Sequence, residues 1–281
     1  MTGFGDRLAQ AMDANGPVCV GIDPHPGLLA AWGLVDGVDG LRTFALTVVE
    51  ALAGRVAALK PQSAFFERHG SRGIAVLEEV IAATRGSGTE LILDAKRGDI
   101  GSTMSGYADA YLREGSSLAA DAVTVSPYLG AGSLMPALEA AVASDRGLFA
   151  LCLMSNPEGR SVQHAVSADG PSVAASIARW AAQQNAERGD VLGPVGLVVG
   201  ATIGDAPAAL GIDLAGVRGP LLAPGVGAQG AGAAELRAVF GAARDAVLAS
   251  TSRAVLSAGP DVAALRAAAA DAVTEAHSAL R

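Results

Sequence analysis

The chain has 281 residues, of which 51% are hydrophobic and 17% charged, and its formal net charge is −8. Such a chain can bury about three quarters of its unfolded surface in a globular core. The negative charge and the lack of a polybasic run argue against nucleic acid or an anionic membrane as partner, so an anionic ligand requires locally placed cations.

The first sixteen residues carry two aspartates and no apolar block, so we expect no signal peptide. An arginine and an aspartate interrupt the alanine-rich tail at 262–273, so we expect no transmembrane span there. Cys19 and Cys152 lie in apolar, strand-like runs, which favours buried free thiols over a disulfide. These features predict a cytoplasmic protein. The four histidines are scattered and no CxxC motif occurs, so the sequence predicts no zinc site.

Eight short apolar or β-branched runs alternate with helix-length segments along the chain. We expect strands at 18–23, 58–62, 90–96, 122–127, 147–154, 195–202, 220–227 and 253–259. We expect helices near 41–54, 73–85, 103–113, 134–144, 171–188, 205–210, 231–248 and 261–279. Eight strand–helix units in a chain near the ~250 residues typical of the fold predict an α/β protein, a single-domain (β/α)8 TIM barrel spanning 1–281. The stretches 155–170 and 203–219 are long enough to be lids or irregular insertions.

Polar residues follow or end several of these strands. Active sites in this fold form at the C-terminal ends of the strands. The residues at those ends are Asp23, Lys60, Asp94, Lys96, Ser126 and, after the seventh strand, Gln229. Each could instead shape a turn, cap a loop or extend its charged end to solvent. Their occurrence at one end of one barrel favours a common site.

The segment LILDAKRGDIGST, residues 91–103, ends an apolar run in four charged residues. Because side chains alternate along a strand, Asp94 and Lys96 should lie on the same face. In a solvated loop such an ion pair would contribute only about 0 to 1 kcal/mol. At the mouth of a barrel the same pair is a candidate active centre.

The segment GVGAQG, residues 225–230, imitates the G-x-G-x-x-G dinucleotide motif. That motif belongs in the first βα turn of a doubly wound sheet, whereas this copy follows the seventh strand, which argues against NAD. Its glycines expose backbone N–H groups near a helix start, which suits an anion. In barrels the loops after strands 7 and 8 bind phosphate. Arg253, at the start of the eighth predicted strand, could donate two hydrogen bonds to it or form a structural ion pair.

The chain resembles, nearly end to end, the orotidine 5'-phosphate decarboxylase family in its longer bacterial form. The resemblance rests on GIDPH (21–25), LKPQSAFFE (59–67), LDAKRGDIGST (93–103), TVSPYLG (124–130) and APGVGAQG (223–230). It implies decarboxylation of orotidine 5'-monophosphate to uridine 5'-monophosphate (UMP) and CO₂, the last step of de novo UMP biosynthesis. It further implies a homodimeric barrel that works without metal or cofactor.

The resemblance also implies a role for each matching residue. Lys96 would donate the proton within an array that includes Asp94, Asp99 and Lys60. Asp99, Ile100 and Thr103 would reach into the partner subunit's site. The substrate contacts would be Asp23 and Lys60 on the ribose, Ser126 on the pyrimidine amide, Gln229 and Arg253 on the phosphate, and Pro224 and Val226 along the base and loop.

Two alternatives remain open at this point. A sugar-phosphate decarboxylase resembling 3-keto-L-gulonate 6-phosphate decarboxylase shares the DxKxxD array but uses Mg²⁺ held by an acidic ligand after the second strand. This chain has Lys60 there, which would repel the ion. A non-catalytic nucleotide-binding barrel would not need Asp94 and Lys96 charged at the cavity floor.

Overall fold

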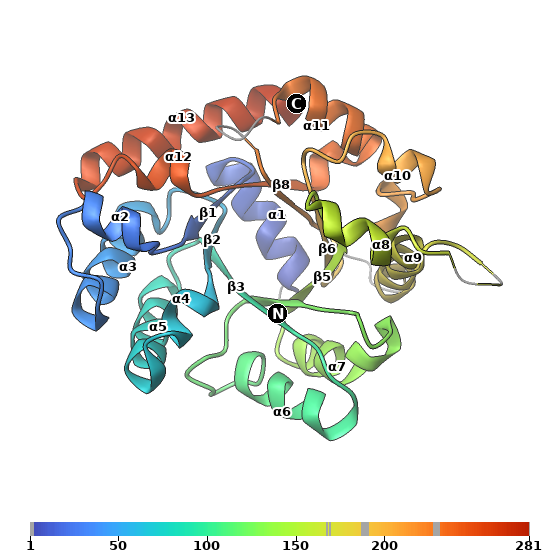
Figure 1. Cartoon of the computed structure of the whole chain (residues 1–281), viewed down its shortest axis with the longest axis horizontal. Coiled ribbons are helices and arrows are strands. Elements are labelled where there is room, and N and C mark those ends of the chain that lie inside the picture. Colours follow the sequence, from blue (N-terminus) through green and yellow to red (C-terminus); the bar gives the residue numbers. More distant parts are fainter. Residues whose placement is uncertain (1–2, 167, 169, 187–190, 227–230, 281) are drawn as a thin grey trace.

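Eight parallel strands form a closed barrel in the order β1 to β8, which confirms the predicted fold (Figure 1). The computed structural model describes residues 3–166, 168, 170–186, 191–226 and 231–280. The strands are β1 (Val18–Ile22), β2 (Ala58–Pro61), β3 (Glu90–Arg97), β4 (Ala122–Val125), β5 (Gly147–Leu153), β6 (Val195–Val199), β7 (Leu221–Pro224) and β8 (Val247–Thr251).

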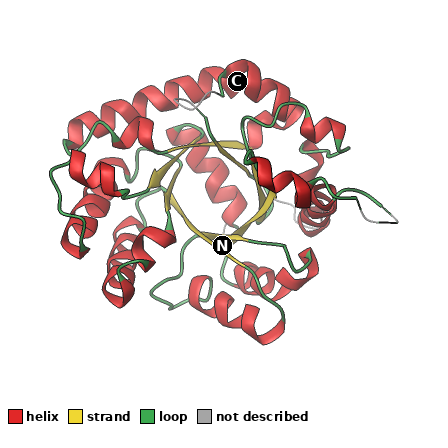
Figure 2. Ribbon diagram, viewed as in Figure 1, coloured by secondary structure: helices red, strands yellow, loops and turns green. Residues whose placement is uncertain are grey.

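Helices surround the barrel as an outer ring (Figure 2). The α-helices are α1 (Phe4–Asn15), α2 (Pro26–Ala31), α3 (Val38–Leu52), α4 (Ser63–Glu67), α5 (Gly70–Thr84), α6 (Gly101–Tyr111), α7 (Met135–Ala143), α8 (Arg160–Gln163), α9 (Val173–Ala186), α10 (Ala206–Ala209), α11 (Ala233–Phe240), α12 (Arg253–Leu256) and α13 (Val262–Leu280). Four 3₁₀ turns join them, η1 (Ala131–Leu134), η2 (Pro157–Gly159), η3 (Ala215–Val217) and η4 (Gly241–Ala246). Within the described residues, no helix is both long enough and apolar enough to cross a membrane.

The eighth strand differs from the prediction. We expected it at 253–259, but β8 is Val247–Thr251 and the expected segment begins helix α12. The expected helix at 231–248 is correspondingly too long, because α11 ends at Phe240. Gly241 follows with φ of +47°, a left-handed conformation that glycine adopts without steric cost and that ends the helix. The two long stretches 155–170 and 203–219 contain short helical turns rather than only irregular chain.

The core has two parts. The larger part fills the space between the strands and the surrounding helices. The smaller part fills the barrel interior and includes α1, which is visible through the barrel in Figure 1. Phe4 on α1 meets Phe149 on β5 edge to face, with ring centroids 6.1 Å apart. Helix α1, which the sequence analysis did not predict, therefore closes the N-terminal end of the barrel with side chains.

Residues that face the barrel interior change from apolar to polar towards the C-terminal ends of the strands. Ala58, Ile92, Ala122 and Leu248 belong to the apolar interior cluster. Two residues further along the same strands lie Lys60, Asp94, Thr124 and Ser250, which line a cavity instead. Because side chains two apart share a face of a strand, each of these strands carries an apolar side chain into the floor and a polar one into the mouth.

Candidate active site

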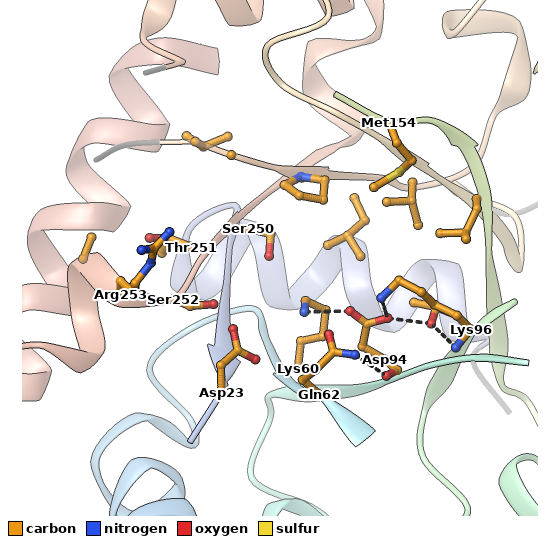
Figure 3. A pocket seen from close by; sticks show the side chains of 18 of the residues that line it. Asp23, Lys60, Gln62, Asp94, Lys96, Met154, Ser250, Thr251, Ser252 and Arg253 are labelled. Atoms are coloured by element: carbon orange, nitrogen blue, oxygen red, sulfur yellow. Dashed lines mark hydrogen bonds and ion pairs between the residues drawn. The ribbon is translucent and has the colours of Figure 1, made fainter. Parts of the chain in front are cut away.

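A cavity of about 310 Å³ opens at the C-terminal ends of the strands (Figure 3). It combines a charged floor with apolar walls. Its lining residues are Asp23, His25, Lys60, Gln62, Asp94, Lys96, Thr124, Leu151, Met154, Val198, Leu222, Pro224, Gly225, Val226, Ser250, Thr251, Ser252, Arg253 and Ala254. Its position agrees with the end of the barrel that the sequence predicts for the site.

The Asp94 carboxylate lies between two ammonium groups at the cavity floor. Lys96 Nζ is 2.6 Å from Asp94 Oδ1, and Lys60 Nζ is 3.1 Å from Asp94 Oδ2. The side chains of Asp94 and Lys60 are each 9% exposed, whereas that of Lys96 is 41% exposed. The buried pair therefore fixes the carboxylate, and Lys96 is the more exposed of the two lysines that line the cavity.

The two buried groups have opposite shifts of pKa. Burial disfavours the charged form of Lys60, but the Asp94 and Asp23 carboxylates outweigh it and raise the pKa of this ammonium. Burial likewise disfavours the charged form of Asp94, but Lys60 and Lys96 outweigh it and lower the pKa of Asp94 to about 2. Lys60 and Asp94 are therefore both ionised at neutral pH, and the Lys96 side chain contacts the other oxygen of the same carboxylate.

A distortion of β3 brings Lys96 to this position. The β3–β4 register shifts between Leu93 and Arg97, and Lys96 has a left-handed backbone with φ of +48°. Asp94 and Lys96 do pair, as the alternation of a strand predicts, but the strand is not regular between them. Non-glycine residues with such a backbone are uncommon and concentrate at functional sites.

Asp23 follows β1 and faces the other side of the cavity. Its Oδ1 is buried and makes no hydrogen bond within the described part of the chain. A buried carboxylate oxygen without a partner is costly unless a ligand supplies a donor. Asp23 is therefore suited to accept a hydrogen bond from a hydroxyl group of a ligand.

Arg253 lies just after β8, at the mouth of the cavity. It is exposed and is the first residue of α12. The correction of the eighth strand explains this location, because the first residue of a strand would lie at the opposite end of the barrel. Pro224, Gly225 and Val226 also line the cavity. Gln229 falls outside the described residues.

Other predicted site residues lie away from this lining. Asp99 Oδ1 accepts a hydrogen bond from the Ile100 N–H at 2.8 Å, Ile100 is 63% exposed and Thr103 is exposed on α6. Ser126 follows β4, and its N–H binds the Arg97 carbonyl at 2.7 Å. None of these four is among the described lining residues of the cavity.

Several lining residues were not predicted from the sequence. Thr124 and Ser250 stand two positions after inward-facing residues of their strands, so counting alternate positions from the apolar floor would have found them. Gln62 lies beyond β2, where its Nε2 donates to the Asp94 carbonyl at 3.1 Å. Within the described residues, no three His, Cys, Asp or Glu side chains gather as a metal site would need. The two cysteines are free and buried, as predicted.

Comparison with known proteins shows which family this chain is similar to in sequence. Residues 16–268 match the model of the orotidine 5'-phosphate decarboxylase / HUMPS family. Orotidine 5'-phosphate decarboxylase from Salinispora arenicola is 60% identical over 280 residues, 100% of this chain and 99% of the relative. The Streptomyces coelicolor enzyme of the same name is 58% identical and covers 96% of this chain and 95% of its own.

Solved structures are also similar to this chain over nearly its whole length. A structure from Streptomyces avermitilis matches with a TM-score of 0.95 at 57% identity and covers 100% of this chain and 96% of that one. Leishmania donovani OMP decarboxylase matches with a TM-score of 0.77 at 32% identity and covers 99% of both chains.

Proposed function

The chain belongs to the orotidine 5'-phosphate decarboxylase / HUMPS family, and from this premise we propose how its barrel-mouth cavity carries out the reaction. The chain is a carboxy-lyase that converts orotidine 5'-monophosphate to UMP and CO₂, the last step of UMP biosynthesis. The observation that carries the mechanism is the Asp94 carboxylate held between Lys60 and Lys96 at the cavity floor.

Lys96 is the proton donor in this proposal. Loss of CO₂ from C6 leaves an electron pair in the plane of the pyrimidine ring, where the ring cannot delocalise it, so the barrier is high. A fixed ammonium group next to C6 stabilises that charge as it develops and then protonates the carbon. Asp94 holds that ammonium group in place through its Oδ1, which lies 2.6 Å from Lys96 Nζ.

The remaining lining residues suit the other parts of the nucleotide. Asp23, with its unpartnered buried oxygen, and Lys60 bind the ribose hydroxyls. Arg253 binds the phosphate together with Gln229, and Pro224 and Val226 bound the base. The phosphate does not react, and the free energy of binding it can then be used to stabilise the transition state at C6. Ser126 keeps its predicted contact with the pyrimidine amide only if ligand binding brings the loop after β4 towards the cavity.

The proposal includes a cytoplasmic homodimer. Asp99, Ile100 and Thr103 lie outside the cavity of their own chain, and Ile100 is an exposed apolar side chain. Such residues can complete the site of a second copy, since a two-fold dimer places each residue reciprocally.

The decisive experiment follows the loss of pyrimidine absorbance when the protein is mixed with orotidine 5'-monophosphate and EDTA. We expect full turnover without added metal, and we expect Lys96→Ala to lower kcat by several orders of magnitude while the circular dichroism spectrum is unchanged. Dependence on Mg²⁺ would contradict the metal-free mechanism, and near-normal kcat in Lys96→Ala would remove the proton-donor role. Lys60 at the end of β2 argues against the Mg²⁺-dependent alternative.

A further inference from the structure

The hydroxyl group of Thr124 links the two residues at the centre of the charged array. Its Oγ1 accepts a hydrogen bond from the Lys96 backbone N–H at 2.9 Å and donates one to Asp94 Oδ1 at 2.8 Å. The directions are fixed, because a backbone N–H can only donate and an ionised carboxylate can only accept. Thr124 lies on β4 and is 1% exposed, so water does not compete for this hydroxyl.

The linkage occurs where β3 departs from regular geometry. The β3–β4 register shifts at this point, and Lys96 has a positive φ. A backbone N–H that leaves a regular ladder still needs an acceptor. The Thr124 side chain supplies that acceptor in place of a strand carbonyl.

The opposite neighbour of β3 binds the same segment. Gln62, which follows β2, donates from Nε2 to the Asp94 carbonyl at 3.1 Å. The segment from Asp94 to Lys96 is therefore bound from both sides by side chains, and Thr124 is the one that reaches both the Lys96 backbone and the Asp94 carboxylate.

We propose that Thr124 is a positioning residue for the decarboxylation: its hydroxyl holds the Lys96 backbone in its left-handed conformation and fixes the rotation of the Asp94 carboxylate between the two ammonium groups. The proposal rests on the role of Lys96 as proton donor. Asp94 Oδ1 receives both the Thr124 hydroxyl and Lys96 Nζ, which leaves Oδ2 for Lys60. Without the hydroxyl, both the lysine backbone and the carboxylate can rotate away from this arrangement.

The test compares Thr124→Val, which keeps the shape and removes the hydroxyl, with Thr124→Ser, which keeps the hydroxyl. We expect Thr124→Val to lower kcat about 10- to 100-fold, the effect of losing a hydrogen bond to a charged group. KM for orotidine 5'-monophosphate should change less than about threefold, because the ribose and phosphate contacts remain. Thr124→Ser should restore kcat to within about threefold of the native value.

Thr89 offers a matched control. Its buried hydroxyl also accepts a backbone N–H, from Gly54 at 2.8 Å, and donates to a carbonyl, that of Val56 at 2.7 Å. It lies just before β3, at the other end of the strand. Thr89→Val should lower the melting temperature about as much as Thr124→Val does, with kcat unchanged.

The outcomes separate this inference from the proposed function. Native kcat in Thr124→Val, or a loss in Thr124→Ser equal to that in Thr124→Val, would overturn the positioning role even if Lys96→Ala is inactive. A loss seen only in KM would also overturn it. If Thr124→Val does not fold, Thr124→Ala is measured instead, and unchanged kcat there is equally contradictory. An active Lys96→Ala would instead refute the proton-donor role itself.

Discussion

Lys60 and Asp94 form an ion pair at the floor of the cavity, with Lys60 Nζ 3.1 Å from Asp94 Oδ2 and both side chains almost fully buried. Breaking a buried pair by removing one partner leaves an uncompensated charge, which typically costs about 3 to 5 kcal/mol. The pair is therefore part of the folding free energy as well as of the site.

The first prediction concerns acid stability. The pKa of Asp94 is lowered from 3.8 to about 2, so the carboxylate stabilises the fold above pH 3.8 and this contribution is lost as the pH falls through 2. Urea denaturation should show that the free energy of unfolding of the native protein falls by about 2 kcal/mol more between pH 5 and pH 2 than that of Asp94→Asn, which lacks the titrating group. Parallel pH curves for the two proteins would contradict the lowered pKa.

The second prediction concerns the phosphate. Arg253→Ala should raise the dissociation constant of UMP at least about tenfold while that of uridine changes little, because only the nucleotide carries the anion. Isothermal titration of both ligands measures this. Arg72→Ala is the control, since Arg72 is exposed on α5 and is not a lining residue. An equal increase in the dissociation constants of UMP and uridine would show that Arg253 does not bind the phosphate.

The third prediction tests the shared site. Lys96→Ala and Asp99→Ala should each be nearly inactive alone. If Asp99 serves the partner's site, a mixed dimer contains one site with both changes and one with neither. Random exchange makes half of the dimers mixed, so activity should return to about a quarter of the native value.

Subunit exchange is verified separately by native mass spectrometry of differently tagged chains. If exchange is complete and no activity returns, Asp99 acts in the site of its own chain.

The fourth prediction concerns the barrel floor. Phe4→Ala removes a buried ring that packs against Phe149 and should lower the free energy of unfolding by about 3 to 5 kcal/mol. KM and kcat should stay close to native, because α1 closes the end of the barrel opposite the cavity. Chemical denaturation and steady-state kinetics measure the two effects. A kinetic defect in a protein that is still fully folded would show that the floor and the mouth are coupled.

Sequence patterns identified seven strands because each is a short apolar or β-branched run that stands between helix-length segments. The prediction of the eighth strand was wrong for a physical reason. The segment from 233 to 256 is rich in alanine and leucine throughout, so periodicity alone does not separate α11, η4, β8 and α12. The positive φ of Gly241 and the pairing of Val247–Thr251 with β1 and β7 depend on the closed barrel. Helix α1 was missed because it precedes β1 and belongs to none of the eight strand–helix units, although its buried residues stand at helical spacing.

The site was predictable where chemistry and strand ends coincide, as at Asp23, Lys60, Asp94 and Lys96. Arg253, which the sequence suggested as a phosphate ligand, lines the cavity although the strand predicted to contain it was wrong. Thr124 could not be recognised as a bridge, since the irregularity of β3 that requires it leaves no trace in local composition.

The left-handed backbone of Lys96 lowers the stability of the fold, whereas the proposed reaction requires the ammonium group of the same residue. Selection for stability and selection for activity should therefore favour different residues at position 96. Lysine at a φ of +48° costs on the order of 1 to 3 kcal/mol relative to a relaxed backbone, and glycine would avoid most of that cost. A library screened only for heat resistance should therefore replace Lys96 with glycine or asparagine. The same library grown without uracil should retain lysine, since only the ammonium group completes the charged array.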